Sequence, residues 1–272
     1  MEKERLDVLL FKKGYSDSRE KARRLIMAGN VLVNGIKEDK PGARFEPSVN
    51  IEIKGNEIPY VSRGGLKIEK ALKFFNIDLK GKVAIDVGAS TGGFTDCMLK
   101  NGASRVIAID VGYGQMAWKL RNDERVKLME RTNIRNIKPG DIEVVADFAA
   151  IDVSFISLKK VIPVVAGLIG DKGEIVCLVK PQFEAGREKV GNKGVVRDPV
   201  VHLEVLKEII SFVKNNGLYV KGLTYSPVKG PEGNIEYLLY ISKVNGSANG
   251  NAVTGDDARE VVTQSHDSLD KG

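Results

Sequence analysis

From Val61 to Lys243 the sequence alternates between short apolar runs and amphipathic stretches, and this alternation constrains the fold more than any other feature. The apolar runs typical of buried strands are Lys82–Val87, Arg105–Asp110, Val126–Glu130, Asp147–Val153 and Glu174–Lys180. The helical patterns cover about 66–75, 92–101, 113–120, 158–168 and 199–215. Strands that alternate with helices form a parallel sheet with helices on both faces, so we expect an α/β fold of the Rossmann-like type.

The last two apolar runs depart from this pattern. Tyr219–Tyr225 and Ile235–Ile241 are joined only by Ser226–Asn234, a segment rich in Gly and Pro. Two strands without a helix between them pair antiparallel, so we expect them to close one edge of an otherwise parallel sheet. The beginning of the final strand then lies at the edge where the parallel strands end.

The first 60 residues have a different pattern of apolar and basic residues, and we expect them to form a separate small α+β unit. Val31-Leu32-Val33, then Asn34-Gly35, then Ile36 predicts a hairpin with a type I′ turn. Basic residues crowd the predicted helices, which is typical of a solvated helix face and equally of a phosphate-binding surface. We therefore expect a domain over 1–60 with a linker at about 56–61, a second domain over 61–243, and a flexible linker with a short helix in 244–272.

Charge and composition exclude several classes of protein. The 42 Lys and Arg outnumber the 36 Asp and Glu, and the net charge of +6 divides into a basic body and an acidic segment after Lys243. A basic body permits nucleic acid as a partner without requiring it. The sequence has no apolar run of about 18 residues, no signal-peptide pattern, two cysteines and two histidines. We expect a cytoplasmic monomer with no membrane span and no metal site.

A glycine-rich loop follows the first predicted strand of the larger domain and opens a helix. It runs from Asp86 to Phe94, and Asp110 stands 24 residues after Asp86 at the end of the next strand. Glycines let a ligand approach the backbone, the helix start offers free N–H groups, and a carboxylate at that place accepts bonds from ribose hydroxyls. The pattern predicts an adenosine-containing cofactor and leaves NAD and S-adenosylmethionine open.

The same loop contains Gly88-x-Ser90-x-Gly92, the pattern of a hydrolase nucleophile elbow. That alternative requires a histidine base late in the fold. His202 lies in a predicted helix and His266 lies beyond the predicted linker, so neither is well placed.

Four charged residues are expected to converge at the carboxyl edge of the sheet. Asp152 and Lys180 each end an apolar strand, and Glu236 opens the antiparallel one. Lys67 begins the helix that leads into the first strand. Unrelated surface charges are the alternative. A cluster of two lysines and two carboxylates suits deprotonation of a weakly acidic alcohol, followed by direct displacement on a methyl donor.

Five motifs in this order resemble the TlyA family. They are Ser62-Arg63-Gly64-Gly65-x-Lys67, Asp86-Val87-Gly88-Ala89-Ser90-Thr91-Gly92-Gly93-Phe94-Thr95-Asp96, Asp152-Val153-Ser154-Phe155-Ile156-Ser157, Lys180-Pro181-Gln182-Phe183-Glu184 and Gly233-Asn234-Ile235-Glu236-Tyr237. Members are S-adenosylmethionine-dependent rRNA 2′-O-methyltransferases, sometimes labelled hemolysins. The first 60 residues resemble an S4-like RNA-binding domain, and the rest resembles an FtsJ-type methyltransferase domain.

The resemblance implies roles for individual residues. It implies a catalytic tetrad of Lys67, Asp152, Lys180 and Glu236, with Lys180 as the base. It implies S-adenosylmethionine as cofactor, with Asp110 on the ribose and Asn133 near the adenine. The remaining cofactor contacts are Asp86, Gly88, Ala89, Ser90, Thr91, Gly92, Gly93 and Phe94.

The implied substrate is the 2′-hydroxyl of cytidine in ribosomal RNA, in the large subunit or in both subunits. Candidate RNA contacts are Arg5 and Arg19 in the small domain and Arg63, Arg131, Phe155 and Arg187 around the active edge. The alternatives are a non-catalytic RNA-binding or ribosome-assembly factor and a membrane-lytic protein.

Overall fold

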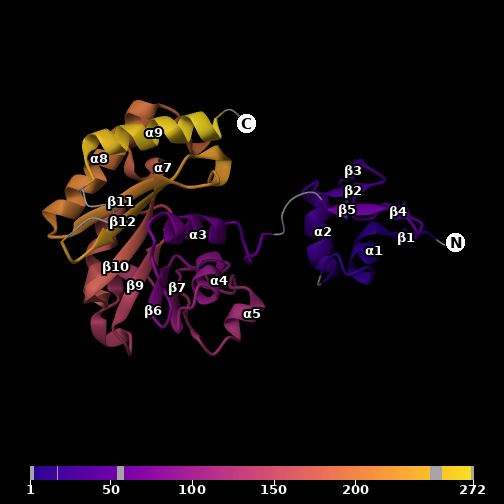
Figure 1. Cartoon of the computed structure of the whole chain (residues 1–272), viewed down its shortest axis with the longest axis horizontal. Helices are drawn as coiled ribbons and strands as arrows, with labels where there is room; N and C mark the ends of the chain where they lie inside the picture. The colour runs from indigo at the N-terminus through magenta and orange to yellow at the C-terminus, as the bar shows by residue number, and fades with distance from the viewer. Residues whose placement is uncertain (1–2, 17, 54–57, 246–252, 271–272) are drawn as a thin grey trace. The chain divides into compact units, whose positions relative to one another are not determined.

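The computed structural model describes residues 3–16, 18–53, 58–245 and 253–270 (Figure 1). The chain divides into two compact units, Met1–Glu57 and Ile58–Gly272. Residues 56 and 57 of the linker predicted at about 56–61, and residues 246–252 of the segment predicted after Lys243, lie outside the described residues. None of the described helices has the length and apolar character of a bilayer span.

The small unit is built from two helices and short strands. Its elements are β1 (Glu4–Arg5), α1 (Leu6–Lys12), α2 (Arg19–Met27), β2 (Val31–Val33), β3 (Ile36–Glu38), β4 (Arg44–Phe45) and β5 (Ile51–Ile53). Strand β2 lies between β3 and β5, and β1 pairs with β4. The β2–β3 turn has Asn34 at φ 51° and Gly35 at φ 79°, as a type I′ turn requires. The leucines of α1 and the inward face of α2 form the core.

The larger unit is a mixed α/β sheet. Its strands are β6 (Val83–Val87), β7 (Arg105–Ile109), β8 (Val126–Met129), β9 (Ala146–Ile151), β10 (Ile169–Val179), β11 (Tyr219–Tyr225) and β12 (Tyr237–Ser242). Their order is β11-β12-β10-β9-β6-β7-β8. Strand β12 is antiparallel to both β10 and β11, whereas β10, β9, β6, β7 and β8 are parallel to one another. The predicted sheet and its antiparallel edge are therefore confirmed.

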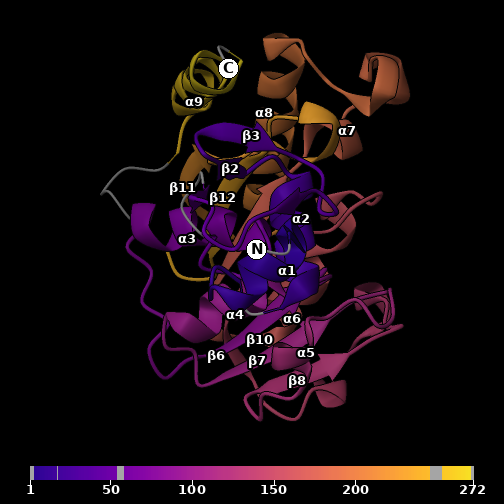
Figure 2. The ribbon, with the colours of Figure 1, turned by 90° about the vertical axis from the view of Figure 1, so that its right-hand side faces the viewer.

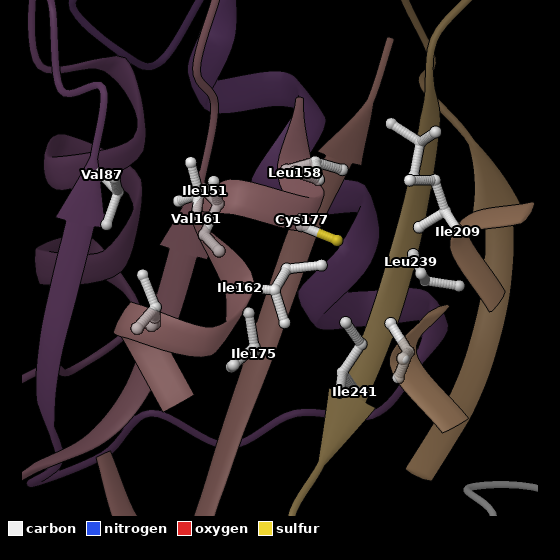
Figure 3. Close-up of a cluster of buried hydrophobic side chains, with 14 of the residues drawn as sticks. Val87, Ile151, Leu158, Val161, Ile162, Ile175, Cys177, Ile209, Leu239 and Ile241 are labelled. Carbon is white, nitrogen blue, oxygen red and sulfur yellow. The ribbon is translucent and has the colours of Figure 1, made fainter. Parts of the chain in front are cut away.

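Helices cover both faces of this sheet. They are α3 (Gly64–Phe74), α4 (Gly93–Lys100), α5 (Trp118–Arg121), α6 (Ile162–Leu168), α7 (Pro181–Glu184), α8 (Pro199–Asn215) and α9 (Gly255–Leu269). Along β10, Ile175 and Cys177 face the cluster shared with α6 and α8 (Figure 3), and Val176 faces the cluster shared with α3 and α4. This alternation follows from the two-residue period of a strand.

The prediction of a helix over about 113–120 is wrong for its first half, since α5 begins only at Trp118. Gly114 has a φ of 72°, and its N–H donates to the Glu130 carboxylate at 2.7 Å. A left-handed residue with its N–H bonded elsewhere cannot continue a helix.

Helix α9 packs on α8 and β11 (Figures 1 and 2). Thr254 caps it, and Ala258, Val262 and Ser265 are buried. The Ser265 hydroxyl lies 3.1 Å from the Tyr237 hydroxyl, which lies 2.7 Å from Nδ1 of the buried His202. The helix predicted in 244–272 therefore joins the core of the larger unit and completes a buried polar network.

Val262→Ala should lower the free energy of unfolding of the larger unit by about 2 kcal/mol, because two buried methyl groups are lost from the α9 interface. Urea denaturation monitored by circular dichroism measures this change. Val200→Ala is the matched control, since Val200 is 61% exposed. Equal effects of the two substitutions would show that α9 does not contribute to the core.

Candidate active site

The sheet topology brings Asp152, Lys180 and Glu236 to one edge. Asp152 follows the last residue of β9, Lys180 follows the last residue of β10, and Glu236 precedes the first residue of β12. Val179 pairs with Tyr237, so Lys180 and Glu236 lie next to each other at the antiparallel seam. Lys67 reaches the same edge from the first turn of α3.

Two short ion pairs join the four side chains. Nζ of Lys67 lies 2.6 Å from Oε2 of Glu236, and Nζ of Lys180 lies 2.6 Å from Oδ1 of Asp152. A longer contact of 4.0 Å between Nζ of Lys67 and Oδ2 of Asp152 links the two pairs. Positive and negative groups therefore alternate, and each buried charge has an opposite charge beside it.

Glu236 is the most buried member of this group, which we call the tetrad. Its side chain is completely buried, whereas that of Asp152 is 20% exposed. Burial raises the pKa of Glu236, and the nearby Lys67 and Lys180 oppose that rise. A Cβ atom on Gly230 would collide with Oε1 of Glu236, so the loop before β12 can approach the carboxylate only with glycine there.

Lys180 has two further neighbours that the sequence analysis did not identify. Its Nζ donates to Oγ of Ser154 at 3.1 Å and lies 5.7 Å from the centre of the Phe183 ring. Ser154 follows Asp152 by two residues and Phe183 follows Lys180 by three, so both lie inside motifs already singled out. Proximity in sequence to a candidate residue is the signal that could have found them.

A cavity of about 710 Å³ opens beside the tetrad. We call it the Asp110 cavity. Its wall includes Gly88, Ser90, Asp110, Asn133 and Asp152. The Asp110 carboxylate accepts the Ser90 N–H at 2.7 Å and the Gly112 N–H at 2.6 Å, so both oxygens are fixed in orientation. A volume of this size is typical of small-molecule sites.

Ala89, Thr91, Gly92, Gly93 and Phe94 are not among the described residues that line the Asp110 cavity. Ala89, Gly92, Gly93 and Phe94 are buried, and a Cβ on Gly93 would collide with the Ser62 hydroxyl. The Thr91 carbonyl accepts the Ala117 N–H.

Asp86 is completely buried at the end of β6 and accepts the Thr95 hydroxyl at 2.6 Å. Asp86 is not one of the described residues that line the Asp110 cavity. The geometry thus gives Asp86 and Thr95 a role in holding the loop.

The RNA candidates of the larger unit are exposed. Arg63 donates to the Lys229 carbonyl at 3.3 Å, and the Arg131 guanidinium lies 4.3 Å from the centre of the Tyr113 ring. Phe155 is 91% exposed, has a φ of 62°, and lies on the wall of the Asp110 cavity. Arg187 is exposed in a short turn after α7.

In the small unit, Arg5 and Arg19 share one partner that the sequence analysis missed. The completely buried Asp7 lies 2.9 Å from Nε of Arg5 and 3.2 Å from an Nη of Arg19. These bonds hold the pKa of Asp7 below its usual range. The two guanidiniums remain about half exposed, so Asp7 fixes their position while the trio keeps a net positive charge.

The sequence of this chain is similar to those of known proteins over both of its units. The FtsJ-like methyltransferase model matches residues 60–243, and the S4 domain model matches residues 4–51. The TlyA protein of Mycobacterium tuberculosis, named as a 16S/23S rRNA (cytidine-2′-O)-methyltransferase, is 42% identical over 87% of this chain and 89% of its own length. The chain belongs to the TlyA family. It is therefore an enzyme of the FtsJ-like methyltransferase class.

Two further relatives of this chain are named differently, one as an rRNA methyltransferase and one as a hemolysin. The Bacillus subtilis protein YqxC, named as an rRNA methyltransferase, is 52% identical and covers 98% of this chain and 95% of its own length. A solved structure from Streptococcus thermophilus that carries the hemolysin label has a TM-score of 0.79 and 47% identity, and it covers 100% of this chain and 98% of its own.

Asp86 gives a prediction about pH. Burial raises the pKa of Asp86 to about 7, so the folded state holds a proton that the unfolded state releases near pH 4. The stabilisation from this group is present at low pH and is lost as the pH rises through about 7. Asp86→Asn, which stays neutral, should therefore lose less stability between pH 5 and pH 8 than the parent.

Thermal unfolding of the ligand-free protein across this pH range checks the prediction. Asp171→Asn, which changes an exposed carboxylate, is the control. Identical pH profiles for Asp86→Asn and the parent would contradict it.

Proposed function

We propose that this enzyme uses S-adenosylmethionine to methylate the 2′-hydroxyl of a cytidine in ribosomal RNA, in the large subunit and in some contexts also in the small subunit. The observation that carries the proposal is the tetrad at the edge of the Asp110 cavity. Support comes from relatives named as (cytidine-2′-O)-methyltransferases of 16S/23S rRNA in M. tuberculosis and of 23S rRNA in Campylobacter jejuni.

The residues of the Asp110 cavity fit S-adenosylmethionine. The fixed Asp110 carboxylate stands at a strand end, where it can accept bonds from two ribose hydroxyls. A Cβ on Gly88 would collide with the Asp152 carbonyl oxygen, so glycine keeps the two loops in contact under the cavity. Asn133 lies farther along the wall, at the place we assign to the adenine. When bound, the cofactor supplies an electrophilic methyl group.

Lys180 is the residue that we assign as base. Asp152 and Ser154 fix the position of its Nζ, and in its neutral form Nζ accepts the proton of the ribose 2′-hydroxyl. Lys67, held by Glu236, places a second positive charge 4.0 Å from Asp152. The tetrad thus orients one lysine and balances its charge, and positioning supplies most of the acceleration.

We assign the contacts with RNA to exposed residues around the Asp110 cavity and in the small unit. Phe155, beside the cavity, can stack on a base that has left its helix, since enzymes that act on structured RNA must expose the target nucleotide. Arg63, Arg131 and Arg187 contact the backbone nearby, and Arg5 and Arg19 serve the RNA-binding domain over 1–60. We assign methyl transfer to residues 61–243 and expect a monomer that acts on ribosomal subunits in the cytoplasm.

Methyl transfer from S-adenosylmethionine with a labelled methyl group tests the reaction directly. We expect label in the RNA of separated large subunits, and in small subunits if both are substrates. Alkaline hydrolysis of the product should leave the methylated nucleotide in a dinucleotide, because a 2′-O-methyl group blocks cleavage. Cofactor binding without label in either RNA would contradict the proposal and favour a non-catalytic RNA-binding factor.

Lys180→Ala should reduce kcat by about 10²–10⁴-fold while the affinity for S-adenosylmethionine stays unchanged, because the substitution removes the proton acceptor and leaves Asp110 in place. Single-turnover kinetics and calorimetry measure the two quantities. Lys172→Ala, an exposed lysine in β10, is the control. Normal turnover by Lys180→Ala would remove it as the base.

A further inference from the structure

A second cavity, of about 510 Å³, lies in the loop between α7 and α8 and has no part in the mechanism above. Its described lining consists of Lys189, Gly191, Lys193, Val195 and Arg197. We call it the Lys193 cavity. The charged side chains in this lining are all basic, although acidic residues flank the loop at Glu188, Asp198 and Glu204.

The three basic side chains differ in their partners. Lys189 lies 2.6 Å from Glu204, which raises the pKa of the lysine. Asp198 caps α8 by accepting the Val200 N–H at 2.8 Å. Lys193 and Arg197 are exposed, and over the described residues neither forms an ion pair. Two cations are therefore available to an anionic ligand.

The backbone of this loop is held in a costly conformation. Lys193 has a φ of 62°, in the left-handed region that residues other than glycine rarely adopt. The Gly191 N–H donates to the Val195 carbonyl at 3.0 Å and closes the turn around Lys193. Strain of this kind persists where the surrounding structure imposes it, and such residues tend to cluster at functional sites.

One buried side chain ties the Lys193 cavity to the tetrad. Nδ2 of Asn234 donates to the Gly194 carbonyl at 3.0 Å, and its Oδ1 accepts the Val196 N–H at 3.2 Å. Asn234 is 4% exposed and precedes Glu236 by two residues. The cavity is therefore fixed in position relative to the site of methyl transfer, as a subsite for a long substrate requires.

We propose that the Lys193 cavity binds a phosphodiester of the RNA strand that carries the target nucleotide, with Lys193 and Arg197 as its ligands. The inference rests on the proposed function, since it assumes that RNA lies across the tetrad. Cations on a polynucleotide-binding surface release counterions from the phosphates, so their contribution depends on salt. Contacts to the backbone are made equally in the ground state and the transition state, so their loss raises KM.

The double variant Lys193→Ala/Arg197→Ala should raise KM for ribosomal subunits about tenfold, with the loss on KM rather than on kcat. The slope of log(kcat/KM) against log[salt] should become shallower by about 1 for each lost contact. The matched control is Lys138→Ala/Lys172→Ala, which removes two exposed lysines near the opposite ends of the strands. A KM and a salt slope equal to those of the control would overturn the inference.

A second measurement uses the unaltered full chain. Acetylation of lysines, read by mass spectrometry, should slow at Lys193 and not at Lys172 when ribosomal subunits are added. Unchanged acetylation of Lys193 would overturn the inference even if the double variant failed to fold. If the parent protein transfers no methyl group to either subunit, the proposed function fails. If it does so and only the Lys193 tests fail, the cavity assignment alone is wrong.

Discussion

The completely buried carboxylate of Glu236 depends on Lys67, and the candidate active site is arranged around that ion pair. An isolated charge in this place would cost several kcal/mol, so removing either partner leaves the other uncompensated. The pair forms between the first turn of α3 and the start of β12. It therefore requires the antiparallel insertion of β12 beside β10, and the same insertion places Lys180 next to the pair.

The small unit also contains a completely buried carboxylate that is paired with basic side chains. Asp7 is as buried as Glu236, and its two arginine partners are anchored at the carboxylate while their outer surfaces face solvent. In both units a buried acid fixes long basic side chains that would otherwise sample many rotamers. A basic side chain that is already fixed loses less conformational entropy when it contacts an anionic group.

The sequence predicts two kinds of feature: helices and strands that have a hydrophobic periodicity, and residues whose position at a strand end follows from the order of the elements. Lys180 follows five apolar residues, so its position at the end of a parallel strand could be inferred, and the same holds for Asp152. The role of Asn234 could not be predicted, because it depends on contacts with Gly194 and Val196 in a distant segment that no local pattern encodes.

Hydrophobic periodicity was wrong for one segment, and for another it predicted the helix but not where the helix packs. The residues before Trp118 have a helical pattern, but the bond from Gly114 to Glu130 prevents a helix there. A short helix was predicted in 244–272, but its place in the core could not be inferred. That place depends on the hydroxyl of Tyr237 and on His202, which come from two other elements.

The position of β12 has a consequence for synthesis of the chain on the ribosome. Lys67 and Glu236 are 169 residues apart, and β12 lies in the sheet between β10 and β11, both of which are made before it. A nascent chain that has reached β11 therefore exposes the apolar edge of β10 with no strand to cover it. During that interval the chain has an open edge at β10 and no ion pair between Lys67 and Glu236, and the insertion of β12 supplies both the missing strand and the missing carboxylate.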